Sequence, residues 1–134
     1  MFKFPKKQKL CNETVIKKMF SNGKSFTTPN VRVVWKDENN EDNAPIKSII
    51  VVPKKKIRLA VKRNIIRRRM KEAYRLNKVE LETILKSKNL QLSIALIYQN
   101  GKILPYNSIV EEIKLILGRL SKEIRELFFL FFSE

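Results

Sequence analysis

The sequence contains no histidine among its 134 residues and only one cysteine, Cys11. Without histidine the chain has no Ser-His-Asp or Cys-His nucleophile system, no imidazole general base and no Cys/His zinc site. A lone cysteine forms no internal disulfide, which favours a reducing, cytoplasmic setting. Catalysis by the protein's own side chains is therefore not expected.

Long apolar runs are also missing. The longest covers residues 127–132, far below the roughly 20 residues that a membrane-spanning helix needs. The N-terminal segment is rich in lysine, and Lys17 and Lys18 interrupt the apolar residues that follow it, so no signal peptide is visible. We therefore expect a soluble protein without a membrane partner.

Acidic residues are scarce, with 13 against 29 basic residues and a formal net charge of +16. Such a charge attracts polyanions. The excess is concentrated in residues 54–75, where 11 of 22 residues are Lys or Arg and Glu72 is the only acid. Apolar residues recur there every three to four positions, which indicates a folded basic helix rather than a disordered tail. Nucleic acid is the expected partner.

The patterning predicts a flexible basic arm over residues 1–10 and one domain over residues 11–134. Helices are expected at 12–20, from 58 or 59 to 77, at 79–86, and from a capping box at Ser108 and Glu111 towards the C-terminus. Strands are expected at 27–36, with another before it as an option, and at 49–52 and 90–98. The first two are predicted to pair across the polar loop 37–45. The fold class is thus a two-layer α/β (α+β) sandwich, with helices packed on a small, mostly antiparallel sheet and a βαβ crossover through the basic helix.

The basic helix is predicted to have two unlike faces. At 3.6 residues per turn, Leu59 lies above Ile66, Met70 and Ala73 on a packed face. The opposite face carries Asn64, Arg67, Arg68, Lys71 and Arg75, with the small Ala60 beside it. Arginine forks hold phosphate through paired hydrogen bonds. One acid does not neutralise this face, so phosphate binding is favoured over the alternative of a solvated charged surface.

The segment VPKKKIRLAVKRNIIRRRMKEAYRLNK resembles the signature of the bacterial ribonuclease P protein component. Its matching elements are Lys55-Lys56, Ala60-Val61, Arg63-Asn64, Arg67-Arg68 and Glu72-Ala73-Tyr74-Arg75. Residues 20–25, FSNGKS, resemble the family's F-x-x-G-x-S turn, and Leu96-Ile97-Tyr98 its last strand. Two positions depart from the family: Ile65 replaces a third basic residue, and Ile16 replaces a frequent aromatic residue.

The resemblance implies a ribonucleoprotein endonuclease that removes the 5′ leader of precursor tRNA. The catalytic RNA then holds the Mg²⁺ ions, the protein has no catalytic residue and binds no metal, and the crossover is left-handed. The implied contacts to the catalytic RNA are Lys54, Lys55, Lys56, Arg58, Arg63, Asn64, Arg67, Arg68, Lys71 and Arg75. A groove between the first helix and the sheet would bind the leader through Ile16, Phe20, Val33 and Trp35, where aromatic rings stack on bases. For Phe20 and Trp35, core packing is the competing interpretation.

Several alternatives stay open. A ribosomal-type structural RNA-binding protein would share the charge and the sandwich, whereas a DNA-binding protein and a stand-alone nuclease rank lower. The acids Asp37, Glu38, Glu41 and Asp42 match no calcium loop and are expected to form a solvated hairpin loop. For Phe128, Phe129, Phe131 and Phe132 core packing is the first expectation, with self-association or a membrane-surface contact as alternatives.

Overall fold

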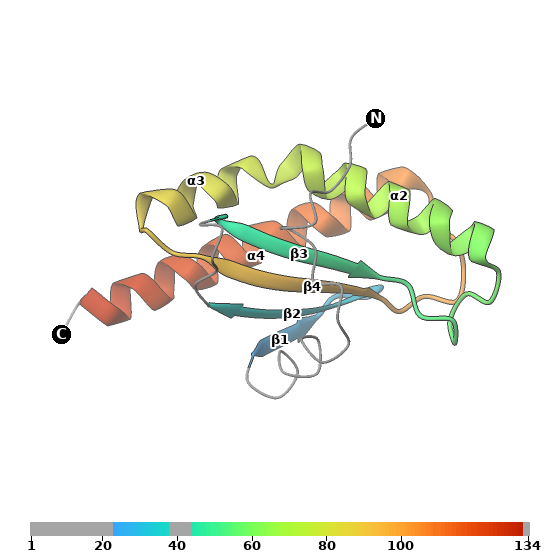
Figure 1. The fold of residues 1–134 in the computed structure, drawn as a ribbon, viewed down its shortest axis with the longest axis horizontal. Coiled ribbons are helices and arrows are strands. Elements are labelled where there is room, and N and C mark those ends of the chain that lie inside the picture. The colour runs from blue at the N-terminus through green and yellow to red at the C-terminus, as the bar shows by residue number, and fades with distance from the viewer. Residues whose placement is uncertain (1–22, 38–43, 133–134) are drawn as a thin grey trace.

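The computed structural model describes residues 23–37 and 44–132, with side chains up to residue 126. The predicted arm, the predicted helix at 12–20 and most of the acidic loop lie outside the described residues. The described part contains four strands and three helices, labelled as in Figure 1.

The strands form one sheet in the order β1-β2-β4-β3. They are β1 (Lys24–Thr27), β2 (Val31–Asp37), β3 (Ile46–Val51) and β4 (Leu92–Tyr98). The pairs β1–β2 and β2–β4 are antiparallel, and β3–β4 is parallel. The mostly antiparallel sheet is confirmed, and the optional first strand is present as β1.

The predicted pairing of segments 27–36 and 49–52 is wrong, because β4 lies between β2 and β3. Every residue of β4 except Ile97 is buried. A strand buried along its whole length needs a neighbour at each edge as well as a covered face. The local loop 37–45 therefore does not form a hairpin, and β3 reaches β4 through a long crossover.

That crossover consists of α2 (Ala60–Asn77) and α3 (Val79–Ser87), and α4 (Tyr106–Phe132) follows β4. In Figure 1, α2 and α3 follow the β3 edge of the sheet while α4 crosses behind it. All three helices share one core cluster with alternate strand residues such as Val33, Ile94 and Leu96. The two-layer sandwich is thus confirmed, with the described helices on one face of the sheet.

Two local predictions are wrong at helix starts. Ser108 does not cap α4, because the helix begins at Tyr106 and the Ile109 amide already donates to the Pro105 carbonyl at 3.2 Å. Leu59 does not pack with Ile66, since it occupies the extended N-cap position of α2 and is 59% exposed. In both cases the helix begins at a different residue from the one that the sequence predicts.

The C-terminal helix continues to Phe132. The phenylalanine side chains from residue 128 onwards lie outside the described residues, so their packing stays a prediction. Within the described ranges, the helices all lack a stretch that is long and apolar enough to cross a membrane.

A buried carboxylate joins the β1–β2 turn to α4. Glu112 is 8% exposed, and its Oε2 accepts hydrogen bonds from the Thr28 hydroxyl at 2.5 Å and the Asn30 amide at 2.8 Å. Its Oε1 accepts from Asn30 Nδ2 at 2.8 Å, and Asn100 Nδ2 donates to Asn30 Oδ1 at 2.7 Å. The turn, the loop after β4 and the helix are therefore held at one point.

Replacing Glu112 with alanine should lower the free energy of unfolding by about 2–3 kcal/mol, because the donors around it lose a charged partner. Urea denaturation would measure this change. Glu111→Ala, one residue earlier and exposed, is the control and should change stability by no more than about 0.5 kcal/mol. Equal effects of the two substitutions would show that the buried network contributes nothing.

Candidate nucleic-acid interface

Helix α2 is held by one side and charged on the other. Ile66, Met70 and Ala73 are each 0% exposed and pack in the core, as predicted. On the remaining surface Asn64 and Arg68 are exposed, while Arg67, Lys71 and Arg75 are partly exposed. The structure thus brings the predicted helix residues together on a side that does not belong to the core. We call these five residues the α2 basic face.

The predicted basic residues before α2 form a compact turn. Lys56 and Ile57 both donate their amides to the Pro53 carbonyl at 3.1 Å. Ile57 is 4% exposed and anchors the turn in the core. Four side chains of the turn are exposed and positively charged: Lys54, Lys55, Lys56 and Arg58. We call residues 53–58 the basic turn.

Short-range pairs orient two arginines of the α2 basic face. Asn64 Oδ1 accepts a hydrogen bond from Arg67 Nη1 at 2.9 Å. Arg75 donates from Nε at 3.2 Å and from Nη2 at 2.6 Å to the two carboxylate oxygens of Glu72. The hydrogen bond from Arg75 lowers the pKa of Glu72, and the same pairing raises the pKa of Arg75. Glu72 is therefore ionised at neutral pH.

Two other arginines of the helix bind backbone carbonyls. Arg63 is partly exposed, and its Nη1 donates to the carbonyls of Ile57 at 3.1 Å and Arg58 at 2.6 Å. Arg69 Nη1 donates to the Leu104 carbonyl at 2.6 Å and thereby joins α2 to the segment before α4. The role of Arg69 was not visible in the sequence, where only its position off the charged face set it apart.

Two tyrosines near this region belong to the core. Tyr74 is 1% exposed, and burial raises its pKa far above the usual range, although a hydrogen bond with Ser48 opposes the shift. Burial also raises the pKa of Tyr98. Both phenols stay neutral under ordinary conditions, so they add no negative charge beside the basic residues.

The predicted leader groove needs correction. Val33 is 0% exposed and Trp35 is 2% exposed, and both belong to the core cluster beneath the helices. Their side chains are thus unavailable to a bound strand, and core packing is the correct interpretation for Trp35. Ile16 and Phe20 lie outside the described residues. Alternation along β2 groups Val33 with Trp35, but it does not say which face the helices cover.

The opposite sheet face has a different character. Arg32, Val34 and Lys36 alternate with the core residues of β2 and so project from that face. Val34 and Ala95 are buried there, with Ile49 and Ile97 packed against them. Lys47 of β3 lies on the same face, because it alternates with the core residue Ile46. An apolar centre with basic residues around it was missed in the sequence, although the alternation of β2 contained the signal.

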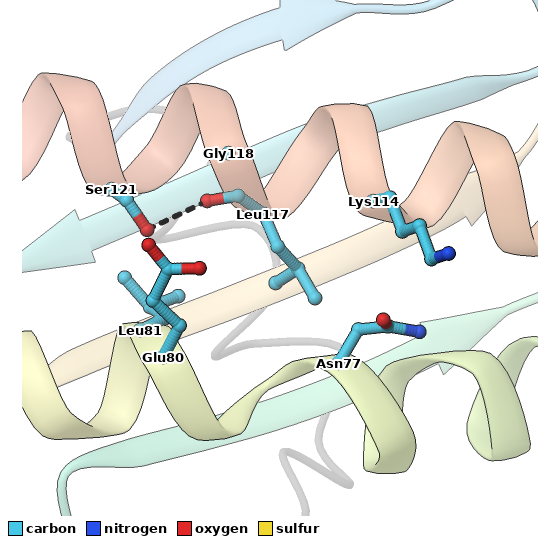
Figure 2. Close-up of a pocket in the computed structure, with 7 residues that line it drawn as sticks. All are labelled: Asn77, Glu80, Leu81, Lys114, Leu117, Gly118 and Ser121. Atoms are coloured by element: carbon cyan, nitrogen blue, oxygen red, sulfur yellow. Dashed lines mark hydrogen bonds between the residues drawn. The ribbon is translucent and has the colours of Figure 1, made fainter.

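A pocket of about 280 Å³ lies away from these basic residues. Figure 2 shows it between the junction of α2 with α3 and the middle of α4, with Leu117 between the end at Asn77 and Lys114 and the end at Glu80 and Ser121. Lys114 and Glu80 give it charges of both signs, so it does not favour a polyanion. Its lining residues are Asn77, Glu80, Leu81, Lys114, Leu117, Gly118 and Ser121.

Metal-ligating side chains do not gather in the part of the chain that is described: no group of three or more His, Cys, Asp or Glu residues is found there. Asp37 ends β2. The other acids of the predicted solvated hairpin loop lie outside the described residues, so their exposure to solvent remains a prediction, but the hairpin is wrong because β4 lies between β2 and β3.

The fold and the charge together define a small basic α/β protein with its charged helix braced on one sheet. A family model for ribonuclease P matches residues 4–121. The ribonuclease P protein component of Porphyromonas gingivalis is 28% identical over 123 residues, which cover 92% of this chain and 90% of that protein. The chain therefore belongs to the ribonuclease P protein family, and family identity implies the RNA of ribonuclease P as a partner.

Solved structures show the same fold. The ribonuclease P protein of Staphylococcus aureus aligns with a TM-score of 0.65 and 21% identity, covering 84% of this chain and 94% of that one. The ribonuclease P protein of Thermotoga maritima aligns with a TM-score of 0.60 and 20% identity, covering 78% and 89%. At these identities the similarity supports the architecture, including the crossover through α2 and α3.

Charge reversal at Arg67 and Arg68 should weaken binding to ribonuclease P RNA by at least about 100-fold, because each arginine can make a charge-assisted contact of roughly 1.5–3 kcal/mol. Folding should change little, since neither side chain is buried. Filter binding and urea denaturation of the same double variant would measure both quantities.

The control is the double variant Lys114→Glu and Lys122→Glu, which changes the net charge equally on exposed positions of α4. Affinity losses of the same size in the two double variants would assign the effect to net charge and contradict a specific role for the α2 basic face.

Proposed function

We propose that this chain is the protein subunit of a ribonuclease P holoenzyme that removes the 5′ leader from precursor tRNA. In this proposal the catalytic RNA performs the cleavage and holds the Mg²⁺ ions, and the protein supports binding. The single observation that carries the proposal is the α2 basic face, which adjoins the basic turn on a helix whose other side is fixed in the core.

The charge distribution supports RNA as the partner of this surface. The face and the turn together present eight Lys or Arg side chains besides Arg63, and Glu72 is the only acid among residues 54–75. Duplex-like RNA is recognised mainly through its phosphates and its shape. A row of arginines on a firmly held helix can bind the phosphates and fit that shape. The lack of histidine in the sequence agrees with chemistry performed outside the protein.

The sheet face opposite the described helices, which we call the second sheet face, is our candidate for the surface that binds the leader. Arg32, Lys36 and Lys47 lie around the partly exposed apolar side chains of Ile49 and Ile97, which pack against the buried Val34 and Ala95. A single strand can use both features, since basic residues follow its phosphates while apolar surface meets its bases. This assignment replaces Val33 and Trp35, which are buried beneath the helices.

The proposal also includes the cytoplasm as the site of action, because an RNA-processing role and a single cysteine both suit a reducing compartment. A structural RNA-binding role of the ribosomal type is the second candidate. It is favoured by the same charged face, which by itself does not require a precursor tRNA.

Cleavage of 5′-labelled precursor tRNA at low Mg²⁺ tests the proposal. The cognate catalytic RNA should cut at the mature 5′ end when this protein is present and much less without it. The double variant Arg67→Glu and Arg68→Glu should fail to stimulate cleavage, as a matched control. Tight RNA binding by the wild-type protein without any stimulation would favour the structural role instead.

The leader assignment makes a separate prediction. Lys36→Gln should weaken holoenzyme binding of precursor tRNA about fivefold, on the order of 1 kcal/mol, through loss of a charge-assisted contact. Affinity for mature tRNA, which has no leader, should stay the same. Lys24→Gln is the control, because Lys24 lies on the helix-covered side, 5.5 Å from the centre of the Trp35 ring. Equal losses for both tRNAs would contradict a leader contact.

A further inference from the structure

The start of α2 lacks the usual stabilising groups. Its N-cap residue, Leu59, makes no side-chain capping bond, and the first turn contains no acid. Lys62 and Arg63 instead bring positive charge to a helix end that already carries a partial positive charge. Another interaction must hold the chain where the basic turn enters the helix.

Arg63 supplies that interaction by reaching back along the chain. Its Nη1 atom donates to the carbonyls of Ile57 at 3.1 Å and Arg58 at 2.6 Å, while its backbone amide donates to the Leu59 carbonyl at 3.0 Å. Ile57 is 4% exposed, so its carbonyl adjoins the interior, where an acceptor without a partner is unfavourable. The Arg63 side chain therefore holds the last two residues of the basic turn at the start of α2.

The segment that Arg63 holds is the most densely charged part of the interface. Lys54, Lys55, Lys56 and Arg58 are all exposed on the basic turn. Among the described residues, the turn is otherwise held by two amides on the Pro53 carbonyl and by the buried Ile57 side chain. Mutual repulsion among four positive charges acts against a single compact arrangement.

We propose that Arg63 is a positioning residue: it clamps the basic turn against α2, so that the four charges of the turn meet the RNA as one surface with the α2 basic face. This inference rests on the proposed RNA-binding function. Because the clamp is formed before RNA arrives, less conformational freedom is lost on binding. The part of Arg63 in recognition is thus indirect and acts through the lysines of the turn.

Arg63→Lys is the informative substitution, because it keeps the charge but replaces the guanidinium, whose Nη1 reaches both carbonyls, with a shorter, flexible side chain that ends in an ammonium group. Hydrogen exchange of the RNA-free protein reports on the clamp directly. The amides of Lys56 and Ile57 should exchange about tenfold faster, while urea denaturation shows nearly wild-type stability. Lys62→Gln, at an adjacent exposed position, is the control and should leave both rates unchanged. Unaltered exchange in Arg63→Lys would overturn the clamp.

A double-mutant cycle then tests the route to RNA affinity. Arg63→Lys should weaken binding to ribonuclease P RNA about tenfold in the wild-type background. In a background with Lys54→Gln, Lys55→Gln and Lys56→Gln, the same substitution should cost less than about twofold, because three of the four charges that it positions are gone. Equal losses in both backgrounds would show that Arg63 contacts the RNA directly. That result would overturn the clamp but leave the proposed function intact. Absence of RNA binding by the wild-type protein would instead overturn the proposed function, and with it the RNA role of the clamp.

Discussion

The rest of the structure depends on one constraint: a helix with a strong positive charge has to be held firmly by its apolar side. Ile66, Met70 and Ala73 are completely buried against the sheet and α4. Burying a side chain of the size of Ile or Met contributes roughly 1.5–3 kcal/mol, more than the repulsion between exposed charges in water. The core therefore fixes the direction of the arginines on the opposite side, and no bound RNA is needed for that.

The charge on α2 is distributed among acceptors of different kinds. Glu72 binds Arg75, the Asn64 amide oxygen binds Arg67, and backbone carbonyls bind Arg63 and Arg69. Each acceptor orients a guanidinium, and the face stays positively charged because Glu72 is the only carboxylate among residues 54–75. Orientation is thereby gained while the attraction for phosphate is kept. A row of carboxylates would give stronger pairing and a weaker field.

The sequence predicts local structure better than long-range pairing. The spacing of apolar residues located α2, α3 and β4 within two residues, because each has a period that its neighbours in sequence determine. The pairing of β3 was wrong because its partner, β4, lies beyond two helices in the sequence. Alternation likewise showed that Val33 and Trp35 share a face, but the face covered by helices depends on how α2 and α4 pack. The charged face was predictable because it needs only the helical period, whereas the second sheet face needs the tertiary fold.

The chain connects these two surfaces directly. Lys47 lies on the second sheet face in β3, the basic turn follows β3, and α2 begins at Ala60. Because β3 is an edge strand, the turn and α2 leave the sheet on the side where no further described strand follows. The positive surface can thus continue from the sheet face around this edge to the helix. Arg63 joins the turn to α2, so its clamp lies on the segment of chain that links the two surfaces at this edge. Loosening the clamp should therefore affect how both surfaces are presented to one RNA–protein assembly.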